Sequence, residues 1–108
     1  MDNFKIIYKI LKHLESSMDF ESVDINPISH TRLNISRIRW EEILIMLYKS
    51  GYITGIVADQ TYSDYSPRIV EPITPRITLN GLEYLQENSM MKKAYKAIKG
   101  IKDIAPLI

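Results

Sequence analysis

The residues that could carry out chemistry in this chain are few, and their spacing does not suit catalysis. The 108 residues include two histidines and no cysteine, which excludes thiolate metal sites, cysteine nucleophiles and disulfides. His13 and His30 have no histidine or carboxylate partner at the i, i+4 spacing of a helical zinc site. We therefore expect both histidines to be solvated or to cap backbone groups, and we expect no metal and no cofactor.

The carboxylates offer no better catalytic arrangement. Glu41 and Glu42 are adjacent, and neighbouring helix residues point in different directions, so the pair does not converge on one substrate atom. Near the start of a helix, the two charges instead favour the helix dipole. Asp59 and Asp64 lie in a polar segment that lacks a third ligand and the EF-hand spacing of a calcium site. The sequence therefore predicts that the protein is not an enzyme.

The composition indicates one soluble domain whose charge is unevenly distributed. Hydrophobic residues make up 45% of the chain, enough for one core at this size. Neither a signal-peptide pattern nor an apolar run of about 20 residues occurs, so we expect a cytoplasmic protein without a membrane partner. Residues 1–88 carry 9 basic against 12 acidic residues, and residues 89–108 carry five lysines against one aspartate. An acidic body does not favour nucleic-acid binding, although the basic tail could approach phosphates.

Helical periodicity predicts a first helix over residues 1–18. Its buried face is expected to contain the apolar residues that recur at three- and four-residue steps, namely Phe4, Ile7, Tyr8, Leu11, Leu14 and Met18.

Residues 27–50 predict a helix-turn-helix. Pro27 suits the first position of a short second helix over residues 27–33. Asn34 tolerates the left-handed conformation of a tight turn, and Ile35 would plug that turn into the core. Ser36 can cap a third helix that extends to Ser50. The expected buried face of this helix contains Trp40, Ile43, Leu44, Leu47 and Tyr48.

After Gly51 the pattern changes from helical to extended. Residues 52–77 predict two strands, over residues 52–58 and 68–77, that are joined by a polar loop. Pro72 and Pro75 favour an edge strand or irregular backbone. Residues 78–105 predict C-terminal helices, for which Thr78 and Ser89 are the expected caps. The predicted fold class is α+β, mainly helical: a single winged helix-turn-helix domain over residues 1–108, with a two- or three-stranded antiparallel wing and an additional C-terminal helix.

Two segments carry a resemblance to a known family. The runs WEEILIMLYKSGYITGI (residues 40–56) and ITLNGLEYLQENSMMKKAYKAIKGI (residues 77–101) resemble the YjcQ family of small winged-helix proteins from Gram-positive bacteria and their phages. The resemblance implies the winged-helix fold and not an activity. By analogy with that fold we expect a DNA-binding, phage-related transcriptional regulator, although such folds also serve as protein-interaction modules. It supplies no catalytic residues.

The first functional hypothesis is that the protein binds double-stranded DNA, with its third helix in the major groove and the loop between the strands beside the backbone. Arginine offers paired donors to guanine or phosphate, and short polar side chains at helix starts bond phosphates. The candidate contacts are His30, Thr31, Arg32, Asn34, Ser36, Arg37, Arg39 and Arg68. Alternatively, Arg32, Arg37 and Arg39 are solvated, or they are paired with the acidic residues Glu41, Glu42 and Asp24.

The second hypothesis is a protein-interaction or dimerisation module without DNA affinity of its own. A helical wheel places three apolar residues on the face of the third helix opposite its core face, and an exposed apolar patch is typical of a protein contact. The candidate partner-binding residues are Ile38, Ile45 and Met46 on that helix, and Met91, Tyr95 and Ile98 on the last one. The partner would be a second copy of the chain or another protein.

Overall fold

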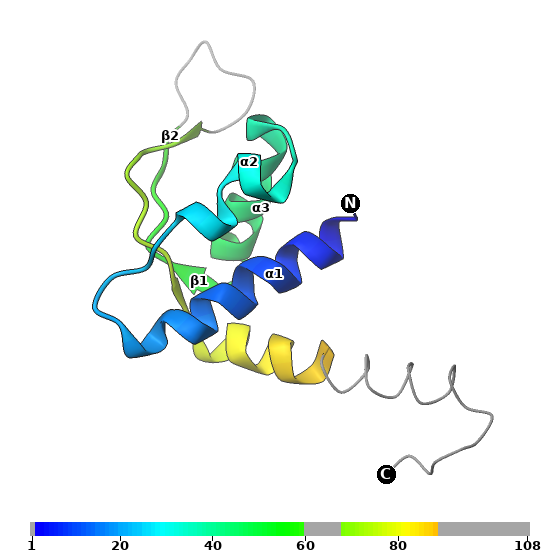
Figure 1. Cartoon of the computed structure of the whole chain (residues 1–108), viewed down its shortest axis with the longest axis vertical. Helices are drawn as coiled ribbons and strands as arrows, with labels where there is room; N and C mark the ends of the chain where they lie inside the picture. The colour runs from blue at the N-terminus through cyan, green and yellow to red at the C-terminus, as the bar shows by residue number, and fades with distance from the viewer. Residues whose placement is uncertain (1, 60–67, 89–108) are drawn as a thin grey trace, which may run out of the picture.

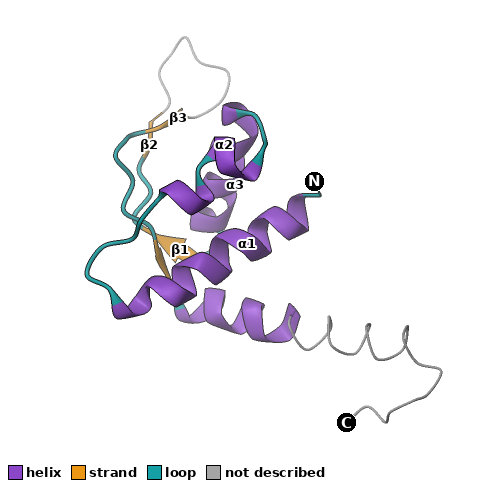
Figure 2. Cartoon of the chain, in the orientation of Figure 1, coloured by secondary structure: helices purple, strands orange, loops and turns teal. Residues whose placement is uncertain are grey.

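A computed structural model describes residues 2–59 and 68–88, and this part of the chain is α+β and mainly helical (Figures 1 and 2). It begins with α1 (Asn3–Ser16), which a single 3-10 turn, η1 (Ser17–Asp19), extends. Asp2 caps this helix, because its carboxylate accepts hydrogen bonds from the backbone N–H groups of Phe4 and Lys5 at 2.7 and 3.2 Å.

The buried face of α1 differs from the expected one. Ile6, Ile10, Leu11 and Leu14 are buried, whereas Phe4 and Met18 are 72% and 55% exposed. The expectation of a face that begins at Phe4 was therefore wrong, although Leu11 and Leu14 belong to the core as predicted. Apolar residues cover more than one side of this helix, so periodicity alone leaves its rotation open and packing against neighbouring elements selects it.

The next segment contains two short helical pieces and a long helix. A 3-10 turn, η2 (Asn26–Ile28), precedes α2 (His30–Leu33), and α3 (Arg37–Lys49) follows. The predicted helix over residues 27–33 is therefore interrupted at Ser29, which is extended and accepts a hydrogen bond from the N–H of Arg32 at 3.3 Å.

The turn between α2 and α3 has the predicted conformation. Asn34 adopts the left-handed conformation with φ 58°, and Ile35 packs against the core while partly buried. Ser36 Oγ accepts a hydrogen bond from the N–H of Arg39 at 3.1 Å and so caps α3.

The core of the described residues joins α1, α2, α3 and the strands. Trp40, Ile43, Leu44 and Leu47 of α3 are buried, as predicted. Tyr48, which was expected among them, is 44% exposed, so that assignment was wrong. The indole N–H of Trp40 donates to the carbonyl oxygen of Ile28 at 2.8 Å, which joins α3 to η2 within the core.

Two antiparallel strand pairs follow and form one irregular ribbon. β1 (Ile53–Thr54) pairs with β4 (Arg76–Ile77), and β2 (Ala58–Asp59) pairs with β3 (Arg68–Ile69). Ile53 lies opposite Ile77, and Ala58 lies opposite Ile69. The two segments of the ribbon stay adjacent between the β1–β4 and β2–β3 pairs. There the N–H of Val70 donates to the carbonyl oxygen of Val57, and the N–H of Thr74 donates to that of Gly55.

The expected strands over residues 52–58 and 68–77 are shorter because the backbone departs from extended geometry between the pairs. Gly55 has φ 82°, and a Cβ atom there would lie 1.8 Å from the carbonyl oxygen of Thr74. On the opposite segment, Pro72 and Pro75 fall in the irregular stretch before β4, as predicted.

A final helix occupies residues 79–88 of the described chain. Thr78 caps it as predicted: Thr78 Oγ1 accepts from the N–H of Gly81 at 3.1 Å and donates to the carbonyl oxygen of Gly51 at 2.5 Å. Leu85 is buried in the core, but Leu79 is 73% exposed. The predicted cap at Ser89 and the helix expected after it lie outside the described residues.

Arg76 fastens β4 to the end of α1. Its guanidinium group donates to the carbonyl oxygens of Ser17 at 3.0 Å and Phe20 at 2.9 Å, and also to that of Glu21.

Within residues 2–59 and 68–88, no helix has the length and apolar character needed to cross a membrane.

Candidate nucleic-acid interface

The α2–α3 turn places several predicted contact residues on one surface segment. Thr31, Arg32, Asn34 and Ser36 are all exposed. Within the described part of the chain, the guanidinium group of Arg32 has no ion-pair or hydrogen-bond partner, so it is available to an anion. These residues lie close together because the left-handed Asn34 makes a tight turn between α2 and α3, which contact each other.

His30 is less accessible than its neighbours. Its ring contacts that of Trp40, with the ring centroids 5.8 Å apart and the planes tilted by 59°, and the residue is half-buried. Because Trp40 belongs to the core, His30 packs at the edge of the core as well as lining the candidate surface. The other histidine, His13, lies with Nε2 2.7 Å from the carbonyl oxygen of Asp24, which confirms the expected capping of a backbone group.

Two arginines at the start of α3 have partners from distant parts of the chain. Arg39 Nε donates to Asn3 Oδ1 at 2.9 Å, linking α3 to the first residue of α1. Arg37 pairs with Glu71 through Nη2, and its Nε lies 4.0 Å from Glu41. Of the acidic partners considered from the sequence, only Glu41 is among these contacts.

Glu41 is a buried carboxylate whose role the sequence did not reveal. The residue is 4% exposed, and Oε2 accepts a hydrogen bond from the backbone N–H of Ile69 in β3 at 3.0 Å. Oε1 lies 3.8 Å from Nε of Arg68, the last of the predicted contact residues. Glu41 therefore fixes the ribbon against α3. Its sequence signal, an acidic residue beside Trp40 on the core side of the helix, is weak.

The exposed face of α3 differs from the expected one. Ile38 and Met46 are 67% and 52% exposed, whereas Ile45 is 5% exposed. The assignment of Ile45 to a partner-binding surface was therefore wrong. The reason is that β3 contacts α3 on the flank of the helix that carries Glu41 and Ile45. Glu42 and Lys49 are exposed on the same helix.

The remaining partner-binding candidates, Met91, Tyr95 and Ile98, lie outside the described residues. The candidate surface therefore consists of the exposed residues of α2, the turn and α3, together with Arg68 in the ribbon.

Residues 30–50 carry an excess of positive charge, whereas the sequence segments before and after them carry an excess of negative charge. Residues 30–50, which contain α2, the turn and α3, carry four basic and two acidic residues. Residues 1–29 carry three basic against five acidic residues, and residues 51–88 carry two against five. The acidity of residues 1–88 therefore comes from the flanking segments, and the helix-turn-helix segment itself is positive.

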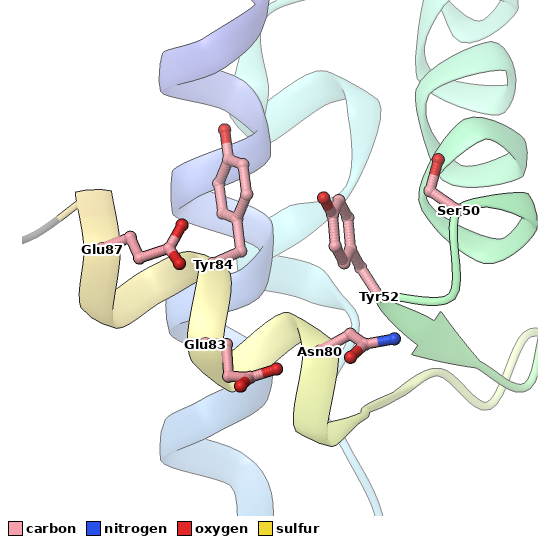
Figure 3. A pocket seen from close by; sticks show the side chains of 6 residues that line it. All are labelled: Ser50, Tyr52, Asn80, Glu83, Tyr84 and Glu87. Atoms are coloured by element: carbon pink, nitrogen blue, oxygen red, sulfur yellow. The ribbon is translucent and has the colours of Figure 1, made fainter.

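The C-terminal end of α3 borders an acidic hollow. A hollow of about 300 Å³ lies between the end of α3 and the helix at residues 79–88, lined by Ser50, Tyr52, Asn80, Glu83, Tyr84 and Glu87 (Figure 3). The rings of Tyr52 and Tyr84 have centroids 5.2 Å apart, and burial raises the pKa of the Tyr84 hydroxyl. The two glutamates make this end unfavourable to phosphate.

Among the described residues, no group of three or more histidine, cysteine, aspartate or glutamate side chains is placed to hold a metal ion. The candidate surface is formed by polar and basic side chains around a tight turn.

Two comparisons with known proteins match most of the chain and agree with each other. The profile of a protein family described as YjcQ protein matches residues 8–104. A protein from Bacillus subtilis (strain 168) named "Uncharacterized protein YjcQ" is 34% identical over 103 residues, which cover 95% of this chain and 97% of that relative. No solved structure matches the chain.

Proposed function

The chain belongs to the YjcQ family, and we propose that it is a DNA-binding winged-helix protein that acts as a transcriptional regulator. The observation that carries the proposal is the location of positive charge. The segment at residues 30–50 is positive, while the segments on either side of it are acidic. A protein that approaches phosphates with one face needs this kind of local excess.

The order of the elements supports the winged-helix part of the proposal. A helix, a short helix, a tight turn and a longer helix are followed by an antiparallel ribbon that packs beside the longer helix. In a DNA-binding winged helix, α3 would be the recognition helix and the ribbon would be the wing. Residues 60–67, which follow β2 and precede β3 in the sequence, lie outside the described residues.

The exposed side chains of α3 include groups that can contact base edges. With Ile45 buried, the outer face contains Ile38, Glu42, Met46 and Lys49. Glutamate can accept a hydrogen bond from cytosine N4, and an apolar side chain can contact a thymine methyl group. Arg32 and the short polar side chains of the turn would hold the phosphate backbone.

The test is fluorescence anisotropy of a labelled mixed-sequence 30-bp duplex, titrated with the full chain at about 50 mM and about 200 mM salt. Binding that weakens steeply with salt indicates several phosphate contacts. The matched comparison is between Arg32→Ala and Lys9→Ala, which remove the same charge from α2 and from the exposed side of α1. Absence of binding at micromolar protein in low salt would refute the proposal.

A second candidate function, protein interaction or dimerisation, is favoured by the exposure of Ile38 and Met46. Both are large apolar side chains on the outer face of α3, and such residues are common at adaptable protein contacts. The measurement is light scattering after size-exclusion chromatography of the wild type and of Met46→Glu. A wild type that is monomeric at high protein concentration removes homodimerisation through this face from consideration.

A further inference from the structure

Arg37 and Arg68 come from different elements, yet their guanidinium groups approach the same oxygen atom. Oε1 of Glu41 lies 4.0 Å from Arg37 Nε and 3.8 Å from Arg68 Nε. The two Nε atoms therefore cannot be further apart than the sum of these distances. The guanidinium group of Arg37 also lies over the ring of Trp40, with Cζ 6.0 Å from the ring centroid. Two guanidinium groups held this close can bind one phosphate group between them.

The carboxylate of Glu41 holds Arg37 and Arg68 from the buried side of the site. Its side chain is 5% exposed, and the hydrogen bond from the Ile69 N–H restrains the carboxylate from the ribbon side. The side chains of Arg37 and Arg68 are, by contrast, 46% and 61% exposed. The two arginines are therefore aligned by a buried anion while part of each side chain remains open to solvent.

Glu71 also contacts this arginine pair, and it does so at the solvent-exposed side. Its carboxylate pairs with Nη2 of Arg37, and its side chain is 46% exposed. An ion pair with both partners half exposed contributes little to stability, because solvent screens it. A backbone phosphate of duplex DNA carries one negative charge, as a carboxylate does, but it belongs to a dense row of such charges. It can therefore displace Glu71 from Arg37.

We propose that Arg37 and Arg68, aligned by the buried Glu41, form a single phosphate-binding site that Glu71 occupies in the free protein. The inference rests on the proposed function, because the phosphate would come from the backbone of duplex DNA. It adds that the start of α3 and the ribbon hold the same phosphate. It also adds that the free protein lowers its own affinity through Glu71.

The experiment follows the side-chain Nε–H signals of arginine by NMR in the full ¹⁵N-labelled chain, titrated with inorganic pyrophosphate. Glu71→Gln removes the competing anion. Glu83→Gln is the matched control, because it removes the same charge from the helix at residues 79–88, far from the arginine pair. Glu71→Gln is expected to bind pyrophosphate about two- to fivefold more tightly than the wild type, and Glu83→Gln is expected to match the wild type. The signals of Arg37 and Arg68 should shift together with one midpoint.

A second arm repeats the comparison with the labelled 30-bp duplex and adds a pair of double variants. Arg37→Ala with Arg68→Ala should lose more affinity than Lys5→Ala with Lys9→Ala, which removes equal charge from α1. If the arginine variant does not fold, because Glu41 is then buried without a cation, the Glu71→Gln comparison decides. The pyrophosphate effect without any duplex binding would support the site and refute the proposed function. Duplex binding with Glu71→Gln no tighter than Glu83→Gln would overturn the site alone.

Discussion

Oε2 of Glu41 accepts a hydrogen bond from the backbone N–H of Ile69 at 3.0 Å, and this bond joins the middle of α3 to a strand 28 residues further along the chain. Both groups are buried. Without it, an N–H group in the core would have no acceptor and the ribbon would lose its polar attachment to α3.

Replacing Glu41 is therefore expected to reveal this attachment. Glu41→Ala should lower the free energy of unfolding by about 1–3 kcal/mol, because the Ile69 N–H is left unsatisfied. Glu41→Gln should cost less, because an amide oxygen can still accept that hydrogen bond. Urea denaturation measures both effects, and Glu42→Ala, on the exposed side of the same helix, is the control. Equal costs at the two glutamates would show that the buried hydrogen bond is not important for stability.

Adjacent residues of α3 should respond oppositely to a charge. Ile45 is 5% exposed and Met46 is 52% exposed, so Ile45→Glu buries an unpaired carboxylate while Met46→Glu keeps its charge in water. Thermal unfolding should show a large loss of stability, by more than about 3 kcal/mol or by failure to fold, for Ile45→Glu only. A stable Ile45→Glu variant would mean that α3 is rotated relative to the ribbon.

Arg32 should contribute to DNA affinity without contributing to folding. Because its guanidinium group has no partner among the described residues, Arg32→Ala should leave the melting temperature unchanged. If the group contacts a phosphate, the salt dependence of duplex binding should fall by about one unit of slope. Lys9→Ala should leave that slope unaltered. A slope that is the same in all three proteins would exclude Arg32 from the interface.

Gly51 and Gly55 share a left-handed backbone conformation but differ in the space available to a Cβ atom. Gly51 and Gly55 both have positive φ, 81° and 82°. A Cβ atom at Gly51 would meet Asn80 Nδ2 at 3.5 Å, which is ordinary contact, but at Gly55 it would lie 1.8 Å from the backbone oxygen of Thr74. Gly51→Ala should therefore cost about 1 kcal/mol, and Gly55→Ala should cost clearly more. The measurement is chemical denaturation, and similar costs would contradict the close approach of the two ribbon segments.

The sequence by itself determined the local features of this protein. The left-handed turn at Asn34, the cap of α3 at Ser36 and the cap of the last described helix at Thr78 all occur as predicted. Each depends on atoms only a few residues apart: the capping hydrogen bonds at Ser36 and Thr78 span three residues. Such bonds form with little regard to the rest of the fold, so residue type and position are enough to predict them. The family resemblance was likewise carried by contiguous runs of sequence.

The tertiary structure decided which faces of the helices are buried and which charges meet. The core face of α1 includes Ile6 and Ile10 rather than Phe4, and Ile45 is covered, because neighbouring elements select one of several apolar faces. The contact between Arg37 and Glu71 joins residues 34 positions apart, and the burial of Glu41 depends on β3. Periodicity along a single helix contains no information about what a distant strand will cover, so these features of the candidate site required the packed fold.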